Sequence, residues 1–478
     1  MKSIILFLTC LSVCFSGLAQ DITGKWQGEL DVYGTNLPLV FHINSSENGY
    51  QAKLDSPKQS AFDIPVDQIS FENNQLSIKI SSLNASYSGE LSEDQTEFSG
   101  EFEQNQMEFP LKLIRQDATT IQDQAENTSP KRYQEPEKPY PYITEEVYFE
   151  NEQQNLRLAG TLSLPEEEGK YPAVILITGS GPHNRNEEMF NHKPFLVIAD
   201  YLTRNGIAVL RYDDRGVAES EGKFEGATSA DFATDAKAAF DYLKTRKEID
   251  STKIGLIGHS EGALIAIKLA AQYHDIGFIG LLAGPGVDGG EVLLRQQELI
   301  SGASGITDSF VQQNKKINKK AYAIIRREND SAVLRDKLKI HFDQASQEFP
   351  DWISGKPQAM TDDKFLNMLI GTYTDPWMRY FIGYNPAKDL EKVTCPVLVL
   401  NGDKDLQVDA EQNLRVIETT LEKADNDLNL TKELKGLNHL FQESQTGLPS
   451  EYGTIEETFS PKALKIIKDW IFNVSKEI

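Results

Sequence analysis

The chain has 478 residues, of which 39% are hydrophobic and 25% are charged, and its formal net charge at pH 7 is −24. A single domain holds roughly 150 residues, so this length predicts several domains, and the composition is that of a globular protein rather than a disordered one. The acidic balance excludes nucleic acid as a partner, because binding to phosphates requires a basic surface.

Residues 1–19 have the features of a signal peptide. Lys2 precedes an apolar run from Ile4 to Phe15, and small residues lead from there to Ala19. The apolar run is shorter than the roughly 20 residues that a membrane-spanning helix needs. We therefore expect cleavage after Ala19, export to the periplasm or the extracellular space, and no membrane insertion of the mature chain.

The mature chain is expected to keep a single cysteine. Cys10 and Cys14 lie in the signal peptide, and Cys395 is the third cysteine of the chain. One thiol cannot form an internal disulfide. Because Cys395 directly precedes an apolar run, we expect a small buried residue at the start of a strand rather than a reactive thiol.

Residues 20–116 alternate apolar and polar positions in short runs, such as 37–43 and 76–80. Turn-forming pairs such as Asn73-Asn74 separate these runs, and no helical pattern intervenes. The region is predicted to be a small all-β domain, either a barrel or a sandwich. The segment Gly24-Lys25-Trp26 resembles the start of lipocalin-like barrels, so a ligand-binding role and a purely structural role both stay open.

Residues 117–142 are rich in Gln, Glu and Pro and lack apolar periodicity, which predicts a linker. From 143 to 478, apolar β-branched runs alternate with helical patterns. This alternation predicts a mostly parallel sheet that is buried on both faces by helices. The apolar runs are 173–178, 208–212, 254–258, 278–283 and 397–400.

One interval breaks the alternation of strands and helices. About 110 residues separate Pro285 from Lys392, whereas a simple crossover needs only a dozen or more. The interval is mostly helical by pattern, and we predict a helical cap at about residues 285–392 that covers the active site. Its basic residues are expected to form a solvated helix face, with attraction of an acidic substrate as the alternative. They are Lys315, Lys316, Lys319, Lys320, Arg326 and Arg327.

The segment Gly258-His259-Ser260-Glu261-Gly262 lies directly after a predicted strand and directly before a helical pattern. This is the context of a nucleophile elbow, a tight turn that requires glycine on both sides of the serine and holds the hydroxyl out of the sheet. We predict Ser260 as the nucleophile of a serine hydrolase, with Gly258, His259 and Gly262 forming the elbow.

A serine nucleophile needs a base and an acid, which follow the serine in chain order in this type of fold. Asp403 and Asp405 come after the apolar run 397–400, and the only histidine beyond them is His439. We prefer Asp405, because the acid commonly lies three residues after the glycine that ends this strand, and Asp403 is the competing acid. The predicted catalytic triad is Ser260, Asp405 and His439.

The oxyanion that forms on attack needs two backbone donors, one after the serine and one in the loop after an earlier strand. These positions predict the backbone N–H groups of Glu261 and Ser180. No metal or cofactor is expected, because the chain has neither an HExxH nor a CxxC spacing.

These motifs together resemble the secreted bacterial α/β-hydrolase esterases of the serine aminopeptidase-like branch, over roughly residues 145–478. The resemblance rests on Gly179-Ser180-Gly181-Pro182 continuing to Asn184-Arg185-Asn186-Glu187, on Asp214-Arg215-Gly216, on the elbow, and on Asp375-Pro376-Trp377-Met378-Arg379-Tyr380-Phe381. Such relatives often have Gln and Asp where this chain has His183, Asn184 and Asn186. The resemblance implies an α/β-hydrolase fold with an eight-stranded sheet, and hydrolysis of acyl esters without a cofactor.

The favoured hypothesis is a serine esterase that cleaves small carboxylic esters, with short acyl groups, through an acyl-enzyme on Ser260. One alternative is an exported aminopeptidase or dipeptidyl peptidase with the same triad, in which the acidic loops 187–188 and 219–221 anchor the ammonium group of the substrate. The other is a binding protein that keeps a hydrolase shell without catalysis, which the intact triad disfavours. The natural substrate and the oligomeric state stay open.

Overall fold

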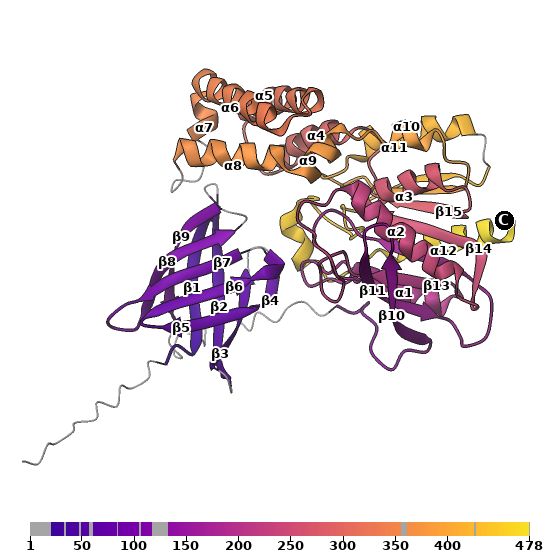
Figure 1. Ribbon diagram of the computed structural model, residues 1–478, viewed down its shortest axis with the longest axis horizontal. Helices are drawn as coiled ribbons and strands as arrows, with labels where there is room; N and C mark the ends of the chain where they lie inside the picture. The colour runs from indigo at the N-terminus through magenta and orange to yellow at the C-terminus, as the bar shows by residue number, and fades with distance from the viewer. Residues whose placement is uncertain are drawn as a thin grey trace, which may run out of the picture.

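The computed structural model describes residues 21–32, 35–46, 49–56, 61–83, 85–104, 107–116, 132–354, 361–424 and 427–477. The predicted signal peptide, with Cys10 and Cys14, and the first part of the predicted linker lie outside the described residues. The described chain forms an all-β part that is followed by a mixed α/β part (Figure 1).

The all-β part is one antiparallel sheet with half-barrel curvature, in the order β4-β3-β2-β1-β9-β8-β7-β6-β5. This confirms the prediction of an all-β domain before the catalytic part, and the described strands form a single sheet rather than two packed sheets. The strands are β1 Gly24–Val32, β2 Thr35–Ser46, β3 Gly49–Ser56, β4 Ala61–Pro65, β5 Gln68–Glu72, β6 Gln75–Ile80, β7 Ala85–Leu91, β8 Glu97–Gln104 and β9 Met107–Arg115, with a short 3₁₀ turn at Ser81–Leu83.

The concave side of this sheet is filled by its own side chains. In β6 every second residue is buried, as the period of a strand with one covered face requires. Trp26, Phe41, Tyr87 and Phe98 are almost completely buried, and the rings of Trp26 and Phe98 lie 4.5 Å apart. The aromatic residue in Gly24-Lys25-Trp26 is therefore part of a packed core.

The α/β part is built on an eight-stranded sheet in the order β10-β11-β13-β12-β14-β15-β16-β17. The pairs β10–β11 and β11–β13 are antiparallel, and the other pairs are parallel, which confirms the mostly parallel sheet. The strands are β10 Ile143–Asn151, β11 Leu156–Leu164, β12 Tyr171–Ile177, β13 Ala208–Tyr212, β14 Ile249–His259, β15 Phe278–Leu282, β16 Val397–Gly402 and β17 Leu430–Leu434.

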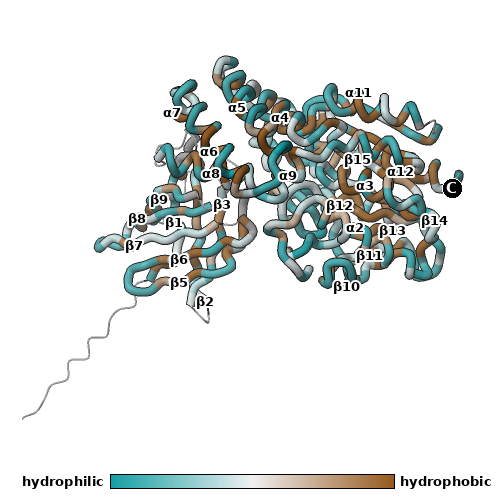
Figure 2. The backbone as a smooth tube through the Cα atoms, turned by 45° about the horizontal axis from the view of Figure 1, so that its top comes forward, coloured by the Kyte–Doolittle hydropathy of each residue, from teal (hydrophilic) through white to brown (hydrophobic). Residues whose placement is uncertain are grey.

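Helices cover both faces of this sheet. The helices α2 (Ser229–Lys244), α3 (Glu261–Gln272) and α11 (Ala410–Leu421) contribute to one hydrophobic core, and α1 (Pro194–Arg204) and α12 (Pro461–Glu477) to the other. Short 3₁₀ turns lie at Glu422–Ala424 and Pro449–Thr454. Figure 2 shows hydrophobic residues along β12, β15 and α3, which is the pattern of a sheet buried between two layers.

The interval between β15 and β16 is a helical insertion, as predicted. Figure 1 shows α5 to α8 standing apart from the sheet, beside the all-β part. The helices of the insertion have a core of their own. They are α4 Gly289–Ala303, α5 Asp308–Arg327, α6 Ser331–Glu348, α7 Pro350–Ser354, α8 Asp362–Thr374, α9 Pro376–Gly383 and α10 Ala387–Leu390.

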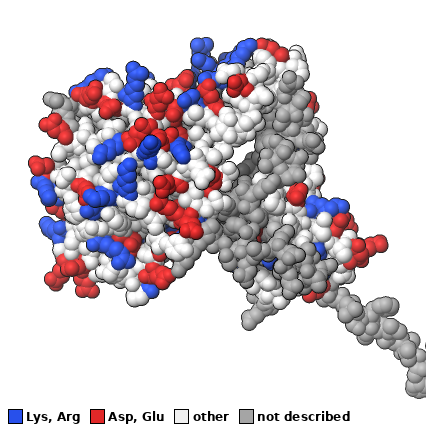
Figure 3. Space-filling view, turned by 180° about the vertical axis from the view of Figure 1, so that it is seen from behind, with Lys and Arg blue, Asp and Glu red and all other residues white. Residues whose placement is uncertain are grey.

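Some of the basic residues of α5 form ion pairs within the insertion. Lys315 contacts Glu298 at 2.9 Å and Lys316 contacts Glu348 at 2.7 Å. Figure 3 shows Lys and Arg side chains interspersed with Asp and Glu on the face that it views. These contacts support the prediction of a solvated helix face. None of the helices in the described ranges is long and apolar enough to cross a membrane.

Candidate active site

Ser260 lies at a sharp turn between β14 and α3, in the predicted sequence of strand, turn and helix. Its backbone has φ 52° and ψ −114°, a conformation that residues with a side chain rarely adopt. Its backbone N–H donates to the carbonyl of Leu282 at 2.8 Å, which fixes the turn to the neighbouring strand. The residue is half-buried and directly follows the last residue of β14, so it lies at the edge of the sheet where the parallel strands end.

No side chain fits at position 258 or at position 262, on either side of Ser260. An ideal Cβ on Gly258 would lie 2.0 Å from the carbonyl oxygen of Gly262, and one on Gly262 would lie 2.2 Å from the carbonyl oxygen of Ile177. Ile177 ends β12 and leads into the loop that begins at Thr178. Gly262 therefore allows α3 to approach the loop that carries the predicted oxyanion donor.

Asp405 and His439 form a buried pair. The Nδ1–H of His439 donates to Oδ2 of Asp405 at 2.8 Å, and Asp405 is 2% exposed. The other oxygen of Asp405 accepts the backbone N–H groups of Gln407 and Val408 at 2.8 and 2.9 Å, which fixes the orientation of the carboxylate. The hydrogen bond between His439 and Asp405 also determines the ring tautomer of His439. Because the proton is on Nδ1, Nε2 is free to act as a proton acceptor.

The competing acid, Asp403, has a different role in the structure. It is exposed, and its carboxylate accepts the backbone N–H of Gly436 at 2.6 Å. It therefore caps the turn that precedes the histidine segment. Of the two carboxylates considered from the sequence, the one that contacts His439 is Asp405.

The predicted oxyanion donors lie on two neighbouring segments. Glu261 is the first residue of α3, so its backbone N–H has no partner within the helix. An ideal Cβ on Gly179 would lie 3.4 Å from Cβ of Ser260, so the loop that contains Ser180 passes close to the nucleophile. The N–H of Gly179 itself donates to Glu187 at 2.7 Å. The N–H of Ser180, the next residue, is thus the candidate donor in this loop.

His259 connects the nucleophile elbow to the base. Its Nδ1 lies 2.9 Å from Oε1 of Glu187, and its Nε2 lies 3.0 Å from the carbonyl oxygen of His439. The rings of His259 and His439 have centroids 4.8 Å apart. The sequence predicted His259 only as a position in the elbow, because its partners are distant along the chain.

The side chain of Glu261 points into the protein and holds three elements together. Its Oε1 accepts the hydroxyl of Ser229 at 2.5 Å and the indole N–H of Trp377 at 2.8 Å. Ser180 also hydrogen-bonds to this carboxyl group. Burial raises the pKa of Glu261 above its usual range, although these hydrogen bonds oppose the shift. Because Trp377 lies on α9, this bond attaches the insertion to the elbow.

A small pocket lies beside the elbow. Its apolar walls include Tyr212, Phe224 and Phe232, and its polar lining includes the carboxyl groups of Glu261 and Asp214. Burial raises the pKa of Asp214 well above its usual range. Gly179 also lines the pocket, so it opens next to the loop that carries Ser180.

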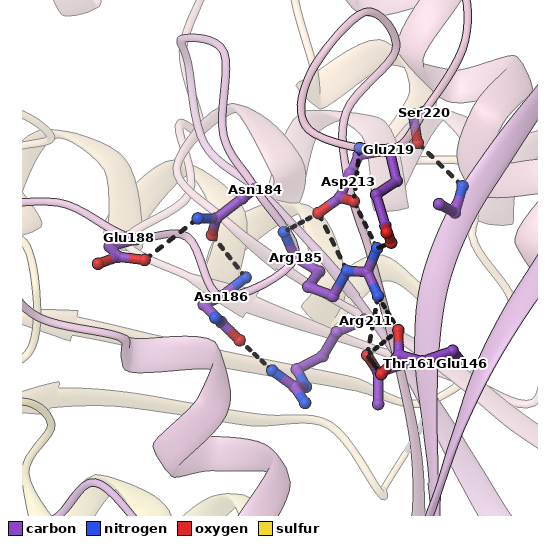
Figure 4. A network of polar contacts seen from close by, with 11 residues as sticks. Glu146, Thr161, Asn184, Arg185, Asn186, Glu188, Arg211, Asp213, Glu219 and Ser220 are labelled. Carbon is purple, nitrogen blue, oxygen red and sulfur yellow. Dashed lines mark hydrogen bonds and ion pairs between the residues drawn. The ribbon is translucent and has the colours of Figure 1, made fainter. Parts of the chain in front are cut away.

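A network of ion pairs centred on Arg185 braces this loop. Figure 4 shows Arg185 between Asp213 and Glu219 on one side and Glu146 and Thr161 on the other. Its guanidinium lies 2.6 Å from Asp213 and 2.7 Å from Glu219, and it also pairs with Glu146. The residues after Gly-Ser-Gly-Pro therefore form a supporting structure that fixes the loop on the sheet.

Three of the carboxylates considered as ammonium anchors have other partners in the structure. Glu187 is buried and contacts His259, Glu219 pairs with Arg185, and Glu221 pairs with Arg157 at 3.3 Å. These contacts disfavour the three carboxylates as ligands of a substrate amine. Glu188 is exposed and accepts a hydrogen bond from the neutral side chain of Asn184 at 3.2 Å.

One supporting residue lies where the sequence predicted only a linker. Arg132 donates to the carbonyl groups of Phe190, Asn191, Gly453 and Ile455. It therefore joins the segment after the Arg185 loop to the segment after His439. The composition of the linker carries no signal for this role, because the role depends on carbonyl groups that are distant in sequence.

The chain is similar to a hydrolase family and to several individual proteins. A family model described as serine aminopeptidase, S33, matches residues 192–443. Esterase EstD of Thermotoga maritima is 31% identical over 144 residues, which are 30% of this chain and 34% of the esterase. An uncharacterised 31.7 kDa protein of Escherichia coli is 25% identical over 52% of this chain and 77% of its own length. An esterase of Pyrococcus furiosus, Pf2001, has 16% identity and a TM-score of 0.41 over 69% of this chain and 92% of its own.

The fold and the site define an α/β-hydrolase with a helical insertion. Because the family model covers just over half of the chain, the chain belongs to the serine aminopeptidase S33 family of α/β-hydrolases. It matches only about a third of the length of Esterase EstD. The reaction therefore has to be argued from the site.

Proposed function

We propose that this protein is a serine esterase that cleaves carboxylic esters with short acyl groups through an acyl-enzyme on Ser260. The observation that carries the proposal is the buried pair of Asp405 and His439 beside the strained turn of Ser260. A carboxylate that fixes the Nδ1–H tautomer of a histidine prepares Nε2 to accept a proton from a serine hydroxyl.

In this mechanism Oγ of Ser260 attacks the acyl carbon while His439 takes the hydroxyl proton. The developing oxyanion accepts hydrogen bonds from the backbone N–H groups of Ser180 and Glu261. His439 then gives its proton to the leaving alcohol, and Asp405 stabilises the charged imidazole in both steps. Water attacks the acyl-enzyme by the same route and releases the acid.

The lining of the pocket favours a small, apolar acyl group. The walls formed by Phe224 and Phe232 suit an apolar chain, and their packing limits its length. We therefore expect hydrolysis to decrease steeply as the acyl chain becomes longer.

The direct test compares the hydrolysis of p-nitrophenyl acetate by the wild-type protein and by Ser260→Ala. We expect the variant to lose about 10⁴-fold or more in kcat. A second series with butyrate and octanoate esters tests the size of the pocket. Equal rates for the two proteins, both near the background, would refute the esterase assignment and would favour a binding role.

Amide hydrolysis is the second candidate, because the matching family is described as a serine aminopeptidase. The same triad serves both reactions, but an aminopeptidase needs a carboxylate that is free to bind the amino group of the substrate. The carboxylates of Glu187 and Glu219 are engaged elsewhere. Aminoacyl anilides separate the two functions: cleavage of the anilide at a rate comparable to that of the ester would favour the peptidase.

We also propose that the protein is exported after cleavage between Ala19 and Gln20. The charged start, the apolar run and the small residues before the cut support this proposal. Mass spectrometry of the protein from a periplasmic or culture fraction should find Gln20 as the first residue. Full-length protein confined to the cytoplasm would contradict it.

A further inference from the structure

The ring of His259 lies between two groups that accept hydrogen bonds. One ring nitrogen faces a carboxylate oxygen of Glu187, and the other faces the backbone carbonyl of His439. A carbonyl cannot donate, and an ionised carboxylate accepts only. If both contacts are hydrogen bonds, each ring nitrogen must carry a proton, and His259 must be an imidazolium ion.

The surroundings of Glu187 favour its ionised form. The same Oε1 that faces His259 also accepts the backbone N–H of Gly179 at 2.7 Å, and two N–H donors on one oxygen stabilise a carboxylate. Glu187 adopts a φ of 51°, which is uncommon for a residue with a side chain and persists only where the surroundings fix it. Its carboxylate is therefore held in place between the loop and the elbow.

The charges of the pair stabilise each other. Burial opposes the charge of His259, but the carboxylate of Glu187 outweighs it and raises the pKa of the imidazole above its ordinary value. Burial likewise opposes the charge of Glu187, and His259 outweighs it and lowers the pKa of this carboxyl group. Both directions favour the ion pair over two neutral groups.

We propose that Glu187 and His259 act as one positioning unit, a buried ion pair that fixes the Gly179 loop through the carboxylate and the backbone of His439 through the imidazolium. The proposal rests on the proposed function for its effect on catalysis. Glu187 accepts the N–H of Gly179 and so determines the orientation of the next residue, Ser180. His259 fixes the main chain of His439, the residue that transfers the proton. One pair thus keeps the oxyanion donor and the base at a constant separation.

The carboxylate is needed because of where the cation lies. The centroid of the His259 ring is 4.8 Å from that of His439, which becomes positively charged during the reaction. An unbalanced charge on His259 would oppose that step, since like charges at this distance in a buried site repel strongly. Glu187 makes the pair neutral overall, so the two hydrogen bonds are kept without this electrostatic cost.

A second buried histidine shows the opposite arrangement and serves as an internal control. Nδ1 of His192 lies 2.9 Å from the hydroxyl of Thr458, which can donate or accept. Nε2 lies 2.9 Å from the carbonyl oxygen of Tyr452 and 2.9 Å from the side-chain amide nitrogen of Gln442, which donates. Burial lowers the pKa of His192 to about 4. These partners do not require a proton on both ring nitrogens, so His192 should be neutral where His259 is charged.

The protonation states can be measured without any substrate. In ¹⁵N spectra of the full chain labelled at its histidines, His259 should show two protonated ring nitrogens at neutral pH, whereas His192 should show one. The ring signals that disappear in His259→Gln belong to His259, and those that disappear in His192→Gln belong to His192. In Glu187→Gln, His259 should lose the proton on Nδ1 and keep the one on Nε2. A single ring proton on His259 in the wild type would overturn the proposal.

Kinetics test the positioning role. His259→Gln should lower kcat for p-nitrophenyl acetate by about 10²-fold with little change in KM, because the lost contacts place groups that act in the transition state. His341→Gln is the matched control: His341 is also 5% exposed and donates to a carbonyl, that of Ile317 at 2.9 Å, but it lies in the insertion. We expect this variant to keep the wild-type kcat. A similar kcat for His259→Gln and the wild type would refute positioning by the pair.

The two proposals fail in different ways. If the wild type hydrolyses no ester, the esterase assignment fails, and the ring protons of His259 still decide whether the ion pair exists. If the wild type is active and His259 carries one proton, the ion pair is refuted while the triad stands.

Discussion

The glycine after the nucleophile provides a quantitative test of how the site is built. An ideal Cβ on Gly262 would lie 2.2 Å from the carbonyl oxygen of Ile177 and 2.7 Å from that of Thr178, whereas real Cβ atoms essentially never approach within 3.0 Å. In Gly262→Ala, α3 and the end of β12 must therefore separate by about 0.8 Å. Both obstacles are main-chain atoms, so no side-chain rotation can relieve the contact.

Two magnitudes follow from this displacement. Overpacking of a close contact costs about 1–3 kcal/mol, and the higher helix propensity of alanine offsets roughly 0.5–1 kcal/mol of this cost. The free energy of unfolding should therefore fall by about 1–2 kcal/mol. The separation moves the Ser260 turn relative to the loop that carries Ser180. A misplacement of about 1 Å typically costs about 10²-fold in rate, so kcat/KM should fall by that factor.

The assay combines urea unfolding with hydrolysis of p-nitrophenyl acetate. Gly371→Ala is the matched control, because Gly371 is an exposed residue of α8 and nothing lies within 4 Å of its ideal Cβ. The control should gain roughly 0.5–1 kcal/mol in stability and keep its kcat/KM. If Gly262→Ala has the unfolding midpoint and the kcat/KM of the wild type, the elbow and the loop are not in the contact described here.

Three further predictions test the acid, a buried arginine and a buried histidine. Asp405→Asn should lower kcat by about 10⁴-fold, whereas Asp403→Asn should stay within a few-fold of the wild type, and the reverse order would exchange their roles. Burial lowers the pKa of Arg211 to about 10, and its side-chain partner is the neutral Asn186. Asn186→Asp would give this guanidinium a charged partner and should raise the free energy of unfolding by about 1 kcal/mol. A lower melting temperature of the variant would contradict this. Because burial lowers the pKa of His192 from 6.5 to about 4, the folded state binds fewer protons than the unfolded chain between these pH values. Stability should fall as the pH decreases through this range, by ~2 kcal/mol at pH 5, and His192→Gln should flatten the urea-unfolding profile there.

The sequence could predict those parts of the fold that leave a local pattern. The apolar run 397–400 forms the first four residues of the buried strand β16, and the run 254–258 lies in the buried half of β14. The last strand, β17, is short, at Leu430–Leu434, and left no apolar run among those predicted. Among the described strands it pairs with β16 alone, so its ends lack a second strand to continue the ladder. The boundaries of the predicted domains stay a prediction.

The supporting contacts of the site could not be predicted from the sequence. His259 and Glu187 are 72 positions apart, and Arg132 lies more than 300 positions from two of the carbonyl groups that it binds. No periodicity or composition links such residues, because their contact depends on how distant loops close over the sheet. The residues of the predicted triad are also far apart, but the fold constrains their order along the chain, and the prediction rests on this order.

Glu261 shows that a variable position of a motif can still be constrained by the structure. The elbow pattern requires nothing of the residue after the serine except its backbone N–H. Here its side chain is 2% exposed and accepts bonds from Ser229 and from Trp377 of the insertion. A shift of α9 is therefore transmitted to Glu261, the residue whose backbone N–H is expected to bind the oxyanion. Changes that displace Trp377 or α9 should for this reason affect kcat as well as the entry of the substrate.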